Sequence, residues 1–224
     1  MVNEKNLIAD TLKHLLSLGA DEVIAVDGGS KDGTCEIIKQ DFPSVRCFET
    51  AYADRALQMN LGAFEAKSDI FLFVHADMRL PQNAVERVKE KIQLGFVGGG
   101  FKKRYSPTNP IMNFYAFLQN VFYLGLMKCL VGSNAIFAIR SAFDAEHGFP
   151  DVAFLEDLMF SECLSRRGKI AVIDEPVTVS SRRYFESGVL RQILKNIRIM
   201  LGHKILHEDL ESLRERYKVI SHGL

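Results

Sequence analysis

Apolar residues recur along the chain with two spacings, which alternate. Helical spacing, with apolar residues every three or four positions, predicts helices after Thr34 and Arg55 and at residues 3–18, 81–94, 141–148, 154–168, 189–201 and 208–217. Short apolar runs predict strands at residues 22–26, 44–48, 70–77, 135–139, 170–173 and 177–180. Asn3 and Ser141 are the expected N-caps of the helices that they open. This alternation predicts an α/β domain.

The run at residues 70–77, IFLFVHAD, carries the first chemical signal. Five apolar residues lead into His75, Ala76 and Asp77, which predicts a buried strand ending in a carboxylate. Ligands of open α/β sheets bind beyond the carboxyl ends of strands, and Asp77 is a hard oxygen ligand suited to Mg²⁺ or Mn²⁺. An ordinary turn cap at Asp77 is the alternative.

The strand at residues 22–26 leads directly into a glycine-rich loop, Asp27-Gly28-Gly29-Ser30-Lys31-Asp32-Gly33-Thr34. Its glycines let the backbone turn sharply and approach a ligand, and Asp27 can accept hydrogen bonds from a base or ribose. The loop lacks both the GxGxxG fingerprint and the Gly-Lys-Ser/Thr of a P-loop, which disfavours dinucleotide and NTPase sites. A plain strand-to-helix turn is the alternative.

Charged residues lie near the starts of two further predicted helices. Arg55 opposes the helix dipole, which a phosphate partner would explain, although a solvated arginine or surface ion pair remains open. Glu156 and Asp157 are acidic residues at a helix N-terminus, where the helix dipole stabilises negative charge whatever their function. One of them can act as a general base for a hydroxyl substrate.

Residues 111–131 form a long apolar segment. Polar residues within it, Asn113, Gln119, Asn120 and Lys128, disfavour a transmembrane helix. A core helix is favoured over an interfacial amphipathic helix. The helix at residues 189–201 is amphipathic and basic.

Composition narrows the function classes. The chain has 28 Lys and Arg residues and 28 Asp and Glu residues, so no overall positive charge favours nucleic acid. Its length of 224 residues predicts one domain. The four cysteines form no CxxC pair, which disfavours a zinc site and a disulfide framework. Together with the absence of a secretory leader, this predicts a cytoplasmic protein.

The motifs, taken in order, resemble the family 2 glycosyltransferases, and the resemblance covers nearly the whole chain. It is nearest to a short bacterial branch associated with radical-SAM or selenoprotein gene neighbourhoods. The matching residues are Asp27 to Thr34, Arg55 to Asn60, His75 to Asp77, Glu156-Asp157 and Ser181 to Tyr184. The resemblance implies an A-type glycosyltransferase fold with a Rossmann-like, mostly parallel sheet. Residues 1–224 would form one domain, with a nucleotide-binding half (1–100), an acceptor-side half (101–186) and C-terminal helices (187–224).

The same resemblance implies roles for individual residues. Asp157, beside Glu156, matches the catalytic base, and Asp77 matches the metal-binding aspartate, with His75 in place of the first Asp of that motif. The donor-binding residues implied by the family are Asp27, Gly28, Gly29, Ser30, Arg55, His75, Asp77, Arg182 and Arg183. The arginines would steady the leaving diphosphate.

The expected activity is metal-dependent, inverting transfer of a hexose from a nucleotide sugar, with a UDP-sugar preferred, to an acceptor hydroxyl. A lipid-linked acceptor, peripheral membrane contact and a homodimer are open possibilities. The family begins with an apolar strand that this sequence is expected to lack, and Gly132-Ser133-Asn134-Ala135 replaces a Gly-Asp-Gln motif at the acceptor side. The alternatives are a catalytically impaired or non-catalytic nucleotide-binding protein, or a membrane-surface binding protein.

Overall fold

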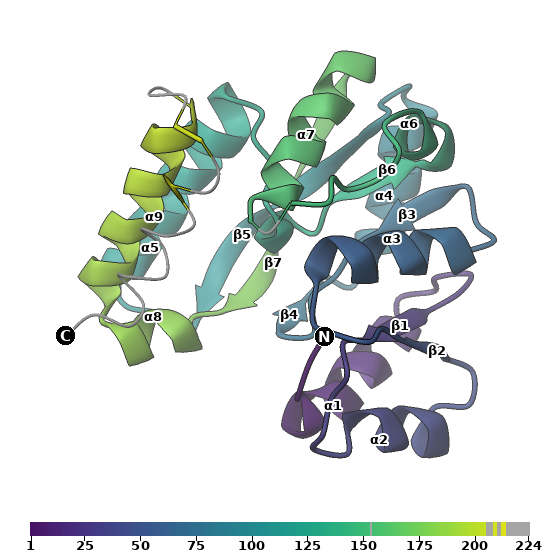
Figure 1. Ribbon diagram of the computed structural model, residues 1–224. Helices are drawn as coiled ribbons and strands as arrows, with labels where there is room; N and C mark the ends of the chain where they lie inside the picture. The colour runs from purple at the N-terminus through teal and green to yellow at the C-terminus, as the bar shows by residue number, and fades with distance from the viewer. Residues whose placement is uncertain (153, 205–207, 210–211, 214–224) are drawn as a thin grey trace.

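The computed structural model describes residues 1–152, 154–204, 208–209 and 212–213 (Figure 1). The α-helices are α1 (Lys5–Leu16), α2 (Thr34–Asp41), α3 (Arg55–Glu65), α4 (Ala84–Gln93), α5 (Pro110–Leu118), α6 (Arg140–Ala145), α7 (Glu156–Arg167), α8 (Arg182–Ser187) and α9 (Val189–Lys204). The strands are β1 (Ile24–Asp27), β2 (Arg46–Glu49), β3 (Ile70–Leu72), β4 (Met78–Arg79), β5 (Gly98–Ser106), β6 (Phe137–Ile139) and β7 (Ile170–Ser180). A π-helix, Gln119–Leu126, extends α5, and a short 3₁₀ helix spans Gly132–Asn134.

The strands form two sheets. β1 and β2 pair in parallel, and the other strands form a five-stranded sheet in the order β3-β6-β5-β7-β4. Within that sheet only β5 and β7 are parallel, while the other three pairings are antiparallel. The α/β fold flanked by helices is therefore confirmed, whereas the expected mostly parallel pairing is wrong.

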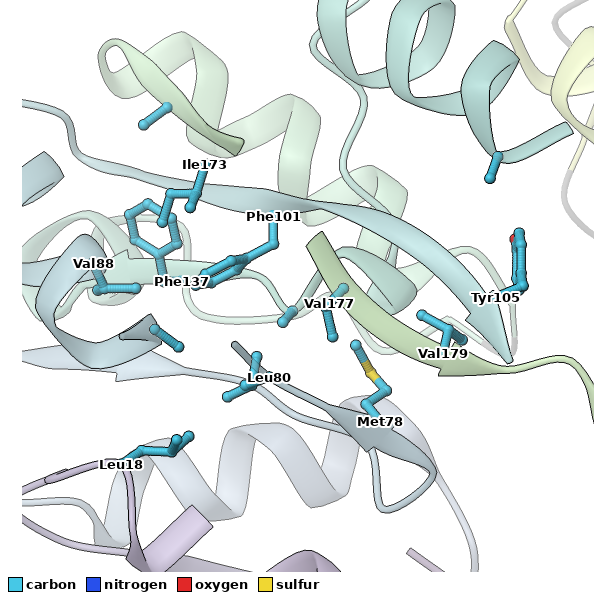
Figure 2. Packing of buried hydrophobic residues seen from close by; sticks show 14 of the residues in the cluster. Leu18, Met78, Leu80, Val88, Phe101, Tyr105, Phe137, Ile173, Val177 and Val179 are labelled. Carbon is cyan, nitrogen blue, oxygen red and sulfur yellow. The ribbon is translucent and has the colours of Figure 1, made fainter. Parts of the chain in front are cut away.

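The core lies between the five-stranded sheet and the helices that cover it. Phe101 of β5 and Phe137 of β6 meet edge to face, with ring centroids 6.4 Å apart. Met78 and Leu80 lie beneath them, beside Val177 of β7 (Figure 2). Burial of this apolar surface is the main stabilising contribution, at roughly 25 cal/mol for each Å² removed from water.

Three strand predictions differ from the structure. β3 ends at Leu72 although Phe73 still donates its N–H to the Ile136 carbonyl. The two predicted strands at residues 170–173 and 177–180 are one strand, β7, whose ladder with β5 is irregular where Pro176 lies. A proline is tolerated at such a bulge because no ladder N–H is needed there.

Strand β5 was not predicted. It opens with three glycines, residues that normally weaken strands, but a Cβ atom at Gly98 would lie 2.5 Å from the Phe137 carbonyl oxygen. The glycines allow close packing of β5 against its neighbours.

The two predicted caps are also wrong. α1 begins after Glu4, and Asn3 has a φ of 53° and accepts a hydrogen bond from the Lys31 N–H. α6 begins at Arg140, with Ile139 in the cap position instead of Ser141. The predicted helix at residues 208–217 lies mostly outside the described residues.

Helix α5 and the π-helix form the expected core helix on one side only. Met112 and Tyr115 are buried, but Phe114 and Phe117 on the other side of α5 are 61% and 59% exposed. α9 lies beside α5 (Figure 1). None of the helices in the described part of the chain combines the length and apolar character needed to cross a bilayer.

Candidate active site

A cavity of about 900 Å³ brings most of the predicted site residues together. Those that line it are Arg55, His75, Asp77, Asp157, Arg182 and Arg183, which come from four separate parts of the chain. Asp27, Gly28, Gly29, Ser30 and Glu156 are not among the lining residues. The lining includes these charged side chains, which we call the polar part of the cavity, and apolar residues of β1 and β3, which we call its apolar part.

The Asp27 side chain organises the glycine-rich loop. It is 1% exposed, and its carboxylate accepts hydrogen bonds from the N–H groups of Gly29 and Ser30 at 3.0 and 2.7 Å. The Ser30 hydroxyl donates a third bond, of 2.6 Å. The turn-forming interpretation of Asp27 therefore accounts for these contacts, and a contact with a nucleotide stays a prediction.

Two glycines of this loop are required by its geometry. A Cβ atom at Gly28 would lie 2.6 Å from Gln58 Nε2 and 2.7 Å from Val2 Cγ2, so a side chain there would have to displace these neighbours. Gly29 has a φ of 83°, which glycine adopts without strain. The loop is thus fixed by packing rather than left open.

Arg55 is held at the start of α3. Asp54 caps this helix by accepting a hydrogen bond from the Leu57 N–H at 2.8 Å, which places Arg55 in the first turn. The Arg55 guanidinium lies 4.0 Å from a Glu156 carboxylate oxygen, and its side chain is 57% exposed. Burial, followed by the nearby Asp157 charge, raises the pKa of Glu156 above its usual value.

His75 and Asp77 occupy the segment after β3. Burial, and then the positive charge of Arg55, lower the pKa of the His75 imidazole to about 3, so it is neutral at pH 7. The Asp77 carboxylate has no hydrogen bond or ion-pair partner among the described residues. Burial raises the pKa of Glu4, and repulsion between Glu4 and the Asp77 carboxylate raises this pKa further.

Asp157 lies in the first turn of α7. Its Oδ2 atom accepts a hydrogen bond from the Gly132 N–H, and its Oδ1 atom accepts one from its neighbour Leu158 at 2.7 Å. Gly132 also packs against the His75 ring, since a Cβ atom on Gly132 would overlap His75 Nε2. The three residues form one contact group beside the cavity.

Lys103 is a site residue that the sequence did not reveal. It is 4% exposed, and its Nζ atom donates to Ser133 Oγ at 2.7 Å. Burial lowers the pKa of Lys103 to about 8, while the Asp157 charge opposes that change. The irregularity of the β5 ladder between Phe101 and Lys103 is the kind of bulge that redirects a side chain near a site.

The side chain of Asn120 holds the Lys103 backbone. Asn120 Oδ1 accepts from the Lys103 N–H at 3.0 Å, and its Nδ2 donates to the Lys103 carbonyl at 2.9 Å. The signal in the sequence is the spacing of two that Lys103 shares with Phe101 and Tyr105, which places these three side chains on one face of a strand. In the structure all three are buried, while Arg104 is exposed.

Comparison with known proteins identifies the family. The family model "Glycosyl transferase family 2" matches residues 1–143, which is more than half of the chain. The chain belongs to this family. Glycosyl transfer from a nucleotide sugar is the activity that this membership supports. A comparison with curated proteins finds no match.

Solved glycosyltransferases have the same fold. A mannosyltransferase from Pyrobaculum calidifontis, PcManGT in complex with GDP-Man and Mn²⁺, is 18% identical, with a TM-score of 0.66 over 100% of this chain and 68% of its own. TarS 1–349 of S. aureus in complex with UDP is 16% identical, with a TM-score of 0.64 over 98% of this chain and 68% of its own. At these identities the likeness establishes the A-type fold.

Proposed function

We propose that this family 2 glycosyltransferase is a metal-dependent, inverting hexosyltransferase with its active site in the polar part of the cavity. The observation that supports it best is the convergence of Asp157, Asp77, Arg55 and the Arg182–Arg183 pair on that cavity. A carboxylate base, an oxygen ligand and phosphate-binding arginines are the groups that sugar transfer from a diphosphate requires.

Asp157 accepts the proton of the acceptor hydroxyl in this proposal. The freed oxygen attacks the anomeric carbon while the bond from that carbon to the diphosphate oxygen breaks, and one displacement inverts the centre. The Gly132 N–H fixes the Asp157 carboxylate through its hydrogen bond. Arg182 and Arg183, at the start of α8, bind the leaving diphosphate.

The residues present fit Mg²⁺ or Mn²⁺. Asp77 lines the cavity with a carboxylate that has no partner among the described residues, and no cluster of three metal-ligating side chains occurs there. Mg²⁺ commonly takes one or two protein carboxylates and completes its shell with water and substrate phosphates. Asp77 would hold the ion, which supplies neutralisation of the diphosphate charge. The mannosyltransferase neighbour, in complex with GDP-Man and Mn²⁺, supports this choice.

Thermal unfolding with nucleotides tests the donor site. UDP, GDP and dTDP are each added with and without Mn²⁺, and binding to the folded state raises the melting temperature by mass action. We expect a Mn²⁺-dependent rise, largest for UDP. A cooperative transition that none of the nucleotides shifts would reject the donor site.

Asp157→Asn tests the base. The substitution keeps the size of the side chain but removes the proton acceptor, so turnover should fall about 10²- to 10⁴-fold while nucleotide binding is retained. Asp174→Asn, at an exposed residue paired with Lys102, is the control and should leave turnover unchanged. Turnover retained near the level of the natural chain would refute the assignment.

We also propose that the protein contacts anionic membrane surfaces and takes a lipid-linked acceptor there. An exposed apolar face on α5, the π-helix and α9 supports this, as do Arg191 and Arg198 on α9. The exposed apolar residues are Ile111, Phe114, Phe117, Val121, Phe122, Leu126, Leu190, Leu194 and Leu201. The described residues of α5, the π-helix and α9 include no Asp or Glu. Apolar and basic surface together favour anionic lipid.

Co-sedimentation with vesicles tests this contact. Binding to anionic vesicles should weaken in a Phe114→Ser, Phe117→Ser double variant, and Phe64→Ser should have no effect because Phe64 is exposed on α3 instead. If the double variant changes the sedimentation coefficient and not vesicle binding, the face joins two copies of the chain.

The motif order further supports the short bacterial branch associated with radical-SAM or selenoprotein genes.

A further inference from the structure

Two cysteines from different elements have their sulfur atoms close together. Cys35 lies in the first turn of α2 and Cys47 lies on β2, and their Sγ atoms are 3.7 Å apart. The other two cysteines make different contacts, Cys129 with a backbone carbonyl and Cys163 with an arginine. A disulfide bond is about 2.05 Å long, so the facing sulfurs would need to approach by only about 1.6 Å to form one.

A small molecule can reach this pair from the surface. The Cys35 thiol donates a hydrogen bond to Glu49 Oε1 at 3.3 Å, and the same oxygen pairs with Lys39 Nζ at 2.6 Å. The side chains of Lys39 and Glu49 are 57% and 52% exposed, which places the pair close to solvent. Cys35 itself is 7% exposed, whereas Cys47 is only half-buried. Cys47 is therefore the more accessible of the two thiols.

The surrounding groups also distinguish the two thiols. Burial, followed by the hydrogen bond to Glu49, raises the pKa of Cys35 to about 12. Burial raises the pKa of Cys47 as well, and the charges of Asp27 and Glu49 add to this rise, but the contact with Cys35 and the charge of Lys39 oppose it. Because the thiolate is the nucleophile in thiol–disulfide exchange, Cys47 is suited to attack first and Cys35 to attack second.

The glycine-rich loop lies between the elements that carry these cysteines. Cys35 directly follows Thr34, which ends the loop, is fully buried and donates both its N–H and its hydroxyl to Asp32. Cys47 pairs in register with Ala25 of β1, the strand that leads into the loop. The elements β1, β2 and α2 lie together in Figure 1. A bond between the two sulfurs would therefore tie the segment after the loop to the strand that pairs with the segment before it.

We propose that Cys35 and Cys47 are a reversible disulfide site, oxidised by a low-molecular-weight disulfide, and that the bond braces the glycine-rich loop. The Cys47 thiolate attacks one sulfur of the reagent, forms a mixed disulfide and releases one thiolate. The Cys35 thiolate then attacks the Cys47 sulfur and releases the second. The released thiolates take up the two protons that the cysteines lose, so the pair is oxidised by two electrons and the reagent is reduced to two thiols.

Oxidised glutathione is the probe for this reaction. The full chain is incubated with it, then unfolded and alkylated, and the remaining thiols are located by mass spectrometry. The natural chain should lose two hydrogen atoms, yield a peptide cross-linked between Cys35 and Cys47, and keep the thiols of Cys129 and Cys163. Dithiothreitol should restore all four thiols. Between pH 7 and 8 the rate should rise about tenfold, as expected for attack by thiolates whose pKa is raised.

Cys35→Ser separates the two steps of the reaction. It removes the second attacking thiol, so the reaction should stop with glutathione joined to Cys47. Cys163→Ser is the matched control, because Cys163 is also half-buried, and this variant should still form the cross-link. A natural chain that keeps all four thiols, or that stops with glutathione on Cys47, would overturn the disulfide site.

Amide hydrogen exchange at Gly29 and Ser30 tests the bracing of the loop. In the oxidised chain this exchange should slow severalfold. The melting temperature should rise by about 5 °C or more, because the cross-link restricts the unfolded chain. The reduced chain and the glutathione-treated Cys35→Ser variant should show neither effect. A cross-link that leaves the loop exchange unchanged would refute the bracing. No nucleotide or sugar is used, so failure here is separable from failure of the proposed glycosyl transfer.

Discussion

Replacing Lys103 with methionine removes a positive charge that the fold buries beside the candidate base. In the folded protein burial lowers the pKa of Lys103 from 10.5 to about 8. At 1.36 kcal/mol for each pH unit, this lowering corresponds to a cost of about 3 kcal/mol for keeping the ammonium charged in the folded state. Methionine has a similar length and no charge, but it leaves Ser133 without its partner, at a cost of about 1 kcal/mol.

The sign of the pH dependence follows from proton binding. Below pH 8 both states hold the Lys103 proton, and the folded state carries the full cost. Between pH 8 and 10.5 the unfolded state binds more protons at this position, so the free energy of unfolding of the natural chain rises with pH. The methionine variant should therefore be more stable by about 2 kcal/mol at pH 7, and should lose that advantage by about pH 10.

Urea unfolding of both proteins at pH 7, 8, 9 and 10 measures the difference between their free energies of unfolding. Titration of all other groups affects both proteins equally and cancels in this difference. Lys102→Met is the matched control, because Lys102 is on the same strand but pairs at the surface with Asp174 and its side chain is 40% exposed. A stability difference between natural chain and Lys103→Met that stays constant from pH 7 to 10 would refute the buried-charge argument.

Further substitutions probe the rest of the site. Asp77→Ala should abolish Mn²⁺-dependent UDP binding in calorimetric titration, and an unchanged titration would count against the metal role. Gly132→Ala should reduce turnover and lower stability by about 1–3 kcal/mol, because its Cβ atom would overlap the His75 ring and lie 3.0 Å from Asp157 Oδ2. Gly19→Ala, with open space around its Cβ and a φ of 74°, should lower stability without affecting turnover.

The sequence predicted those features that depend on local pattern. α3 and α9 follow from apolar spacing, and the glycine-rich loop follows from residues that only a tight turn requires. The rule that ligands bind beyond the carboxyl ends of strands pointed to Asp77. The family resemblance implied the site roles of Arg55, His75 and Asp157, and these residues line the same cavity as Asp77.

Features set by distant contacts were not predictable in this way. β5 was missed because its glycines disfavour a strand locally and become acceptable only against Phe137 and Ala171. The burial of Lys103 depends on Asn120 and Ser133, which are 17 and 30 residues away. The antiparallel pairing of β3 with β6 likewise joins segments more than sixty residues apart along the chain.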